Sequence, residues 1–271
     1  MRRAVLIISF IISAQVLPAQ QTLEDINSTL KNLYLRLNTA TEDTTRCQVN
    51  DSIDLYINSY VNSKSVFTKN LRDLRYLGQI TSPDSLLKIV TWNLALENHK
   101  GFFYSYIIRR KSKEEPATIY RLSSPYNETP ILSDTTYSQS EWYGALYYDT
   151  RPVRIKGNNC WIVLGINPAD PLITRKIIDV ISFNESDSIM FGKKIFLNER
   201  LRNRVVFQYE SAGMMTLRFN SDTSIVFDHL VPVGATSDNR PLYGADYSYD
   251  SYTFTNGTWA FSKNFDARNK E

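Results

Sequence analysis

Residues 151–166, which read RPVRIKGNNCWIVLGI, indicate the fold class of this chain. Two runs rich in β-branched and apolar residues, 151–156 and 159–166, flank Gly157-Asn158-Asn159, and a short polar turn between such runs predicts a β-hairpin. The same pattern predicts further strands at 87–92, 102–109, 117–122, 142–148, 175–183, 193–197, 204–209, 214–219, 224–228, 247–254 and 258–262. Asn256-Gly257, between the last two, is the strongest hairpin signal, because both central residues of a type I′ turn need positive φ.

The order of these strands favours an antiparallel domain. No stretch of the second part alternates strands with long helices, so a parallel doubly wound sheet is disfavoured. We therefore predict a predominantly antiparallel β domain over residues 79–271, built as a sandwich, a barrel or an irregular propeller. Residues 82–85 (SPDS) fit either a helix start or a type I turn, and the alternating residues after them favour the turn.

A short helical segment is predicted ahead of the β domain, over residues 20–78, so the fold class is α+β. The helix expected over 22–38 has Thr22 as its cap and one apolar stripe at steps of three and four, formed by Leu23, Ile26, Leu30, Leu33 and Leu37. Residues 39–50 are polar and predict a loop. Two further helices are expected over 51–62 and 66–77, the second ending before Gly78.

The first nineteen residues have the layout of a secretory signal peptide. Arg2 and Arg3 precede an apolar run that reaches Leu17, and Ala19 offers a small residue for cleavage before Gln20. The run is shorter than the roughly 20 residues that a membrane-spanning helix needs, and no later run is longer. We therefore expect residues 1–19 to be removed and a soluble mature chain, with no transmembrane segment, to be exported to the periplasm, the cell surface or the medium.

Composition excludes several classes of protein. The 271 residues include 42% hydrophobic residues and a formal net charge of only +3, which excludes intrinsic disorder. Removal of residues 1–19 takes away two arginines and no acidic residue, so the charge of the mature chain falls to +1. A near-neutral chain gives no reason to expect nucleic-acid binding, and two histidines make a histidine-built metal site improbable. We expect no metal and no other cofactor.

Cys47 and Cys160 are the only cysteines. Export permits a disulfide between them. Cys160 lies in an apolar strand, however, where a free buried thiol behaves as a small hydrophobic side chain, and this second interpretation is favoured.

The sequence contains two small clusters of candidate binding residues and no zinc-protease, nucleophile-elbow or phosphate-loop motif. Asp228 and His229 follow an apolar strand, although adjacent strand residues point to opposite faces and need not touch. Asp246 and Asp250 would share a strand face with Ser248, where the oxygens suit a hard cation or the two carboxylates suit an acid–base pair of a glycosidase. A solvated edge strand explains the same pattern and is favoured.

Several segments occur in an order that resembles a family of exported proteins of Gram-negative bacteria for which no activity is known. The segments are Ser82-Pro83-Asp84, Trp92-Asn93, WYGALYYD at 142–149, TRKIIDV at 174–180, IVFDHL at 225–230 and YGADYSYD at 243–250. The resemblance runs from about residue 70 to Asn269 and implies a bacterial exported protein. It implies a shared framework around Asp228-His229 and Asp246–Asp250, and it supplies no reaction.

We therefore expect a non-enzymatic binding or assembly module of the bacterial envelope, whose partner is an envelope protein or a glycan. The alternative is a glycan-binding or glycan-hydrolysing protein with Asp246, Asp250 and exposed Tyr or Trp rings in its cleft. A third interpretation is an esterase or peptidase that uses His229.

Overall fold

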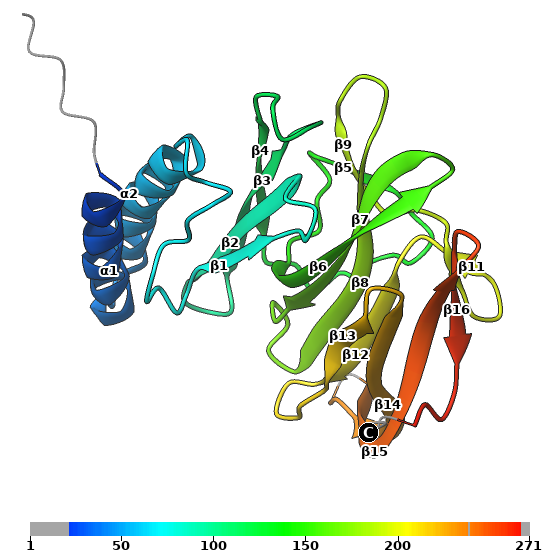
Figure 1. Cartoon of the computed structure of the whole chain (residues 1–271). Coiled ribbons are helices and arrows are strands. Elements are labelled where there is room, and N and C mark those ends of the chain that lie inside the picture. The colour runs from blue at the N-terminus through cyan, green and yellow to red at the C-terminus, as the bar shows by residue number, and fades with distance from the viewer. Residues whose placement is uncertain (1–21, 238, 267–271) are drawn as a thin grey trace, which may run out of the picture.

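The structure, a computed structural model, describes residues 22–237 and 239–266, so the predicted signal peptide lies outside the described residues. Two helices, α1 (Leu23–Thr39) and α2 (Asp43–Val61), stand at the N-terminal end, and strands dominate the remainder of the described chain (Figure 1). The α+β fold is therefore confirmed, and the sheets stack as a β-sandwich.

The described strands form three sheets. The first sheet has the order β1 (Gly78–Thr81), β2 (Leu87–Ala95), β3 (Gly101–Arg109) and β4 (Thr118–Pro125). The second has the order β5 (Tyr137–Ser138), β9 (Ile189–Phe191), β8 (Ile173–Phe183), β7 (Asn158–Asn167) and β6 (Leu146–Ile155), and β12 (Val205–Glu210) also pairs with β8. The third has the order β11 (Leu201–Arg202), β10 (Phe196–Leu197), β16 (Thr258–Ser262), β15 (Pro241–Thr255), β14 (Ser224–Ala235) and β13 (Leu217–Ser221). Neighbouring strands are antiparallel except β10 and β16.

The layers follow one another from the helices to the third sheet, with an apolar core in each gap (Figure 1). Ile53 and Ile57 of α2 meet Trp92 on one face of the first sheet. The opposite face of that sheet packs on the second sheet, whose far side packs on the third. The second sheet is thus covered on both faces, which explains why the predicted strand 159–166 is apolar at nearly every position rather than at alternate ones.

The helical segment departs from the sequence prediction in two places. Helix α2 begins at Asp43, so the predicted loop over 39–50 is wrong. Its early turns bury Val49 in the first core, and Asn50 accepts a hydrogen bond from the indole of Trp92 at 3.0 Å. This tertiary contact outweighs the polar composition that favoured a loop.

The helix predicted over 66–77 is also wrong, because this segment forms turns and bends. Leu71 and Leu74 are buried as an apolar stripe should be, yet side chains replace the helical hydrogen bonds. The Gln79 amide accepts from the Leu71 N–H at 2.9 Å and donates to the Leu71 carbonyl at 3.0 Å. The Arg72 N–H donates to Asn27 of α1 at 2.8 Å. Apolar spacing alone could not distinguish this arrangement from a helix.

The structure forms turns in three regions where the sequence predicts them. The hairpin predicted at Gly157-Asn158-Asn159 forms with its turn one residue earlier, at Lys156 and Gly157, and the turn at Asn256 and Gly257 forms where it was predicted. These four residues have positive φ values between 49° and 84°, as type I′ turns require. Residues 82–85 form the expected turn, in which the Ser85 N–H donates to the Ser82 carbonyl at 2.7 Å. The strand predicted over 142–148 begins only at Leu146 and continues without a break to Ile155.

The two cysteines are free thiols, so the disulfide considered from the sequence is not formed. Cys47 packs against the first core and Cys160 lies in the third, on opposite sides of the first and second sheets. Within the described ranges, neither helix has the length and apolarity needed to cross a membrane.

Candidate functional site

The most irregular part of the third sheet lies where β14 and β15 pair. Asp228 is opposite Tyr249 and Leu230 is opposite Ala245, so three residues of β15 stand against the single residue His229. This bulge places Tyr247 at φ 68° with 95% of its surface exposed. Positive φ is an outlier for a bulky side chain, and such backbone strain is most often retained at functional positions.

Asp246 holds the bulge in shape. Its Oδ1 accepts hydrogen bonds from the Ser248 N–H at 3.0 Å and from the Ser248 hydroxyl at 2.7 Å. These bonds to Ser248, together with nearby His229, lower the pKa of the exposed Asp246 carboxyl. The bulge also breaks the simple alternation that put Asp246, Ser248 and Asp250 on one strand face.

His229 and Asp250 form a pair across the two strands. The Nδ1 atom of His229 lies 2.7 Å from Oδ2 of Asp250, which is only 4% exposed. The other carboxylate oxygen, Oδ1, accepts the Asn264 N–H at 3.1 Å. A carboxylate acceptor holds the proton of a neutral imidazole on Nδ1 and leaves Nε2 as the acceptor atom of the ring.

Asp228 points elsewhere, as the alternation of strand faces leads one to expect. Its Oδ2 accepts the Thr216 N–H at 2.7 Å, and its own N–H donates to the Thr216 carbonyl at 3.2 Å. Asp228 therefore closes the end of the β13–β14 ladder. Of the four candidate residues, the structure brings His229, Asp246 and Asp250 together and leaves Asp228 apart.

A groove of about 470 Å³ lies beside the bulge, and we call it the bulge groove. It is lined by Arg218 of β13, by Tyr247, Ser248 and Tyr249 of β15, and by Asn264, Phe265 and Asp266. The last three residues form its wall, which is fastened by the Asn264 bond to Asp250 and by the Phe265 N–H, which donates to the Tyr249 carbonyl at 2.7 Å. Asp250 thus supports both His229 and the wall of the groove.

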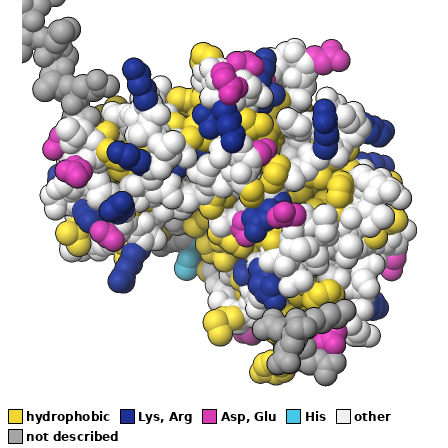
Figure 2. Space-filling model, viewed as in Figure 1, with side chains coloured by type: hydrophobic (Ala, Val, Ile, Leu, Met, Phe, Trp, Pro, Cys, Tyr) yellow, Lys and Arg dark blue, Asp and Glu magenta, His cyan; other side chains and the backbone are white. Residues whose placement is uncertain are grey.

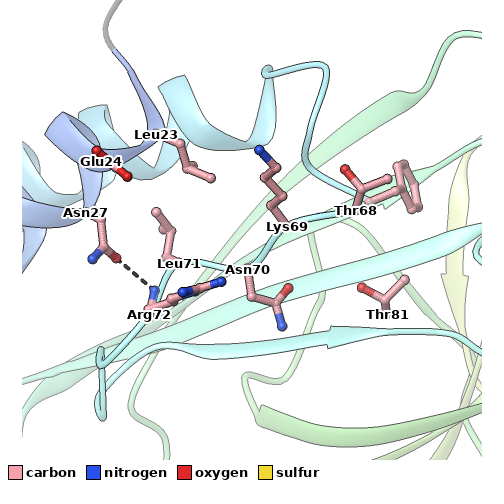
Figure 3. Close-up of a pocket in the computed structure, with 10 residues that line it drawn as sticks. Leu23, Glu24, Asn27, Thr68, Lys69, Asn70, Leu71, Arg72 and Thr81 are labelled. Atoms are coloured by element: carbon pink, nitrogen blue, oxygen red, sulfur yellow. Dashed lines mark hydrogen bonds between the residues drawn. The ribbon is translucent and has the colours of Figure 1, made fainter.

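A second hollow, of about 660 Å³, lies between the start of α1 and the segment 67–72 (Figure 3). Lys69 and Arg72 bring positive charge to it and Glu24 brings negative charge. Beneath it the buried Lys88 donates to Asn70 at 2.5 Å, and burial lowers the pKa of this lysine to about 8. Glu24 lies in the first turn of α1, where the helix N-terminus would otherwise attract an anion, so its carboxylate disfavours an anionic ligand in this hollow.

Sequence reasoning missed a buried polar network in the second sheet. Oδ2 of Asp179 accepts hydrogen bonds from the Tyr143 hydroxyl at 2.7 Å and from Nε of Arg204 at 3.0 Å. Arg204 also donates to the carbonyls of Thr135 and Phe191, at 2.7 and 2.9 Å. Asp179 and Arg204 are fully buried, and desolvation raises the pKa of Asp179 against the opposing charge of Arg204. An aspartate inside the apolar run 177–181 is the signal that could have revealed this network, and the full burial of its ion pair makes its role structural.

Other features narrow the kinds of site that this chain offers. All four tryptophans are buried, so Tyr247 is the aromatic ring most open to a ligand among the described residues. In the same described part, no three His, Cys, Asp or Glu side chains gather closely enough to hold a metal. Positive and negative side chains are interspersed over the visible face rather than gathered by sign (Figure 2). No protein-family model, curated protein or solved structure matches the chain.

Proposed function

We propose that this chain is an exported, non-enzymatic binding module of the bacterial envelope and that its ligand occupies the bulge groove. The observation that carries the proposal is Tyr247. The Tyr247 ring is almost fully exposed, so its burial does not stabilise the fold. The left-handed backbone conformation of the same residue lowers the free energy of unfolding by about 1–3 kcal/mol. A residue that weakens the free protein in this way is best explained by a contact that it makes with a ligand.

The hydrogen bonds around the groove argue against hydrolysis. The Ser248 hydroxyl donates to Asp246 rather than to His229, so within residues 22–237 and 239–266 no hydroxyl nucleophile is hydrogen-bonded to the imidazole. Both oxygens of Asp250 accept hydrogen bonds, and Asp246 accepts two from Ser248. These bonds disfavour either carboxylate as the acid or base of a glycosidase, and no serine of the described chain is hydrogen-bonded to the imidazole as an esterase or peptidase would require.

Export rests on residues 1–19 and is tested separately from binding. Expression of the full 271-residue chain in a Gram-negative host should yield a mature protein outside the cytoplasm whose first residue is Gln20. Cell fractionation and N-terminal sequencing measure this. A full-length chain that stays in the cytoplasm would contradict the proposal.

Binding is tested by sedimentation of the mature protein with envelope fragments from the same host. Tyr247→Asn removes the ring and keeps a residue that tolerates positive φ, so it should weaken binding about tenfold while the fold survives. Tyr76→Ala removes another exposed ring, far away on the helical segment, and should bind as the wild type does. Equal binding by all three proteins would refute the bulge groove as the site.

A further inference from the structure

We propose that the ligand of the bulge groove is a neutral glycan, and this inference rests on the binding function proposed above. The chemistry of a sugar ring has two parts: a face of C–H groups that packs on aromatic rings, and a rim of hydroxyls that forms paired hydrogen bonds. The groove offers both kinds of partner. Tyr247, Tyr249 and Phe265 supply rings, while Arg218, Asn264 and Asp266 supply planar polar groups.

The aromatic rings of the groove form an open surface on which a ligand ring can stack, rather than an enclosed pocket for an apolar side chain. The Tyr247 ring is exposed to solvent, whereas Tyr249 and Phe265, which also line the groove, are half-buried. A polar ring ligand can lie on such a surface and keep its hydroxyls in water or against the rim. The volume of about 470 Å³ lies within the usual range of about 300–1,000 Å³ for small-ligand pockets.

The polar groups are placed where they can meet neighbouring hydroxyls. The planar ends of Arg218 and Asn264 carry N–H donors, one of which, on Arg218, already bonds Asn220 at 3.3 Å, and the Asn264 amide adds an acceptor. Asn264 itself has φ 55°, and its backbone is fastened to the buried Asp250, so its position is fixed before any ligand arrives. Pre-organised polar groups lose less entropy on binding, which favours recognition of a weakly apolar ligand.

A peptide is the less suitable occupant. The commonest peptide mode adds a strand to a sheet edge, but the bulge interrupts β15 and Pro232 removes a backbone donor from β14. Arg218 and Asp266 bring opposite charges to the groove lining, which therefore has no excess of positive charge to attract an acidic polysaccharide, and this favours a neutral glycan.

The test uses the mature protein and envelope fragments divided into three portions: untreated, digested with protease, and oxidised with periodate, which cleaves vicinal diols of sugars. We expect binding to survive the protease and to fall at least tenfold after periodate. Binding that survives periodate and is lost after protease would overturn the glycan while leaving the proposed binding function intact. Failure to bind even untreated fragments would overturn both.

Two variants tie the result to the groove. Asn264→Asp keeps the shape, the positive φ and the backbone bond to Asp250, but exchanges the two amide donors for a second carboxylate oxygen. It should weaken binding to protease-treated fragments about tenfold, as Tyr247→Asn should. Tyr76→Ala is the control, and circular dichroism verifies that each variant is folded. Unchanged binding by both groove variants would overturn the glycan site.

Discussion

At the scale of single residues, two side chains in this protein work against its stability. Tyr247 holds a strained backbone without burying its ring, and Lys88 buries a charge between the helices and the first sheet. The Lys88 ammonium donates a hydrogen bond to Asn70, and the Tyr60 ring lies 5.5 Å from it. For each residue, a single substitution should change the free energy of unfolding in a direction that can be stated in advance.

Replacement of Tyr247 by Gly should leave stability unchanged or raise it by up to about 1 kcal/mol, because Gly adopts positive φ without steric cost but gains more freedom in the unfolded chain. Tyr247→Ala is the matched control, since it removes the ring and keeps the strain. Urea denaturation measures both. A Gly variant clearly less stable than the Ala variant would show that the positive φ at this position carries no strain.

Replacement of Lys88 by Met should stabilise the protein by about 1–3 kcal/mol at pH 7, because it removes a buried charge and keeps the chain length. The pKa of Lys88 is lowered to about 8 in the folded state, so between pH 8 and about 10.5 the unfolded state binds the extra proton. Stability of the wild type should therefore rise across this window relative to Lys88→Met. Denaturation at pH 7, 8.5 and 10 measures the difference, and a constant gap would contradict it.

At the scale of helices, strands and turns, the sequence predicted correctly those elements that are stabilised by interactions between residues close together in the chain. The stripe from Leu23 to Leu37 and the Asn-Gly turn at 256–257 gave the right structures, because helix periodicity and positive φ act within a few residues. The helix predicted over 51–62 is confirmed within α2, but its first turns and the segment 66–77 were mispredicted, because distant partners, Trp92 and Gln79, stabilise the observed structures. The candidate site shows the same division. The sequence pointed to His229, Asp246 and Asp250, while the bulge that exposes Tyr247 arises from the register of two paired strands.

The segment 66–77 gives the prediction at this scale. Gln79→Ala should lower the free energy of unfolding by about 1–3 kcal/mol, because it leaves the backbone N–H and carbonyl of the buried Leu71 without their partner. Gln79→Glu can still accept from the Leu71 N–H and should cost less than Gln79→Ala. Thermal unfolding measures the order. Exchange of the Leu71 amide hydrogen should be slowest in the wild type. If Gln79→Ala is as stable as the wild type, the Gln79 side chain does not stabilise this segment.

At the scale of the whole molecule, sheets with two covered faces join the three cores into one structure. The second sheet contributes to the second and third cores, and the Asp179–Arg204 network lies in its interior. Arg204 reaches beyond that sheet to the carbonyl of Thr135 in the connection before β5, and its guanidinium stacks 4.6 Å from the Tyr137 ring. The network therefore fixes a long connection to a central strand.

This geometry makes a prediction that differs from the usual behaviour of buried ion pairs. Arg204→Met should destabilise the protein by about 3–5 kcal/mol, because it leaves the Asp179 carboxylate buried without its counter-charge. Apolar replacement of both partners of a simple pair is often neutral. Here the double variant Asp179→Leu/Arg204→Met should recover only part of the loss, since the carbonyls of Thr135 and Phe191 still lack the guanidinium that bonds them. Urea denaturation of the double-mutant cycle measures this, and recovery to wild-type stability would show that Arg204 serves only to neutralise Asp179.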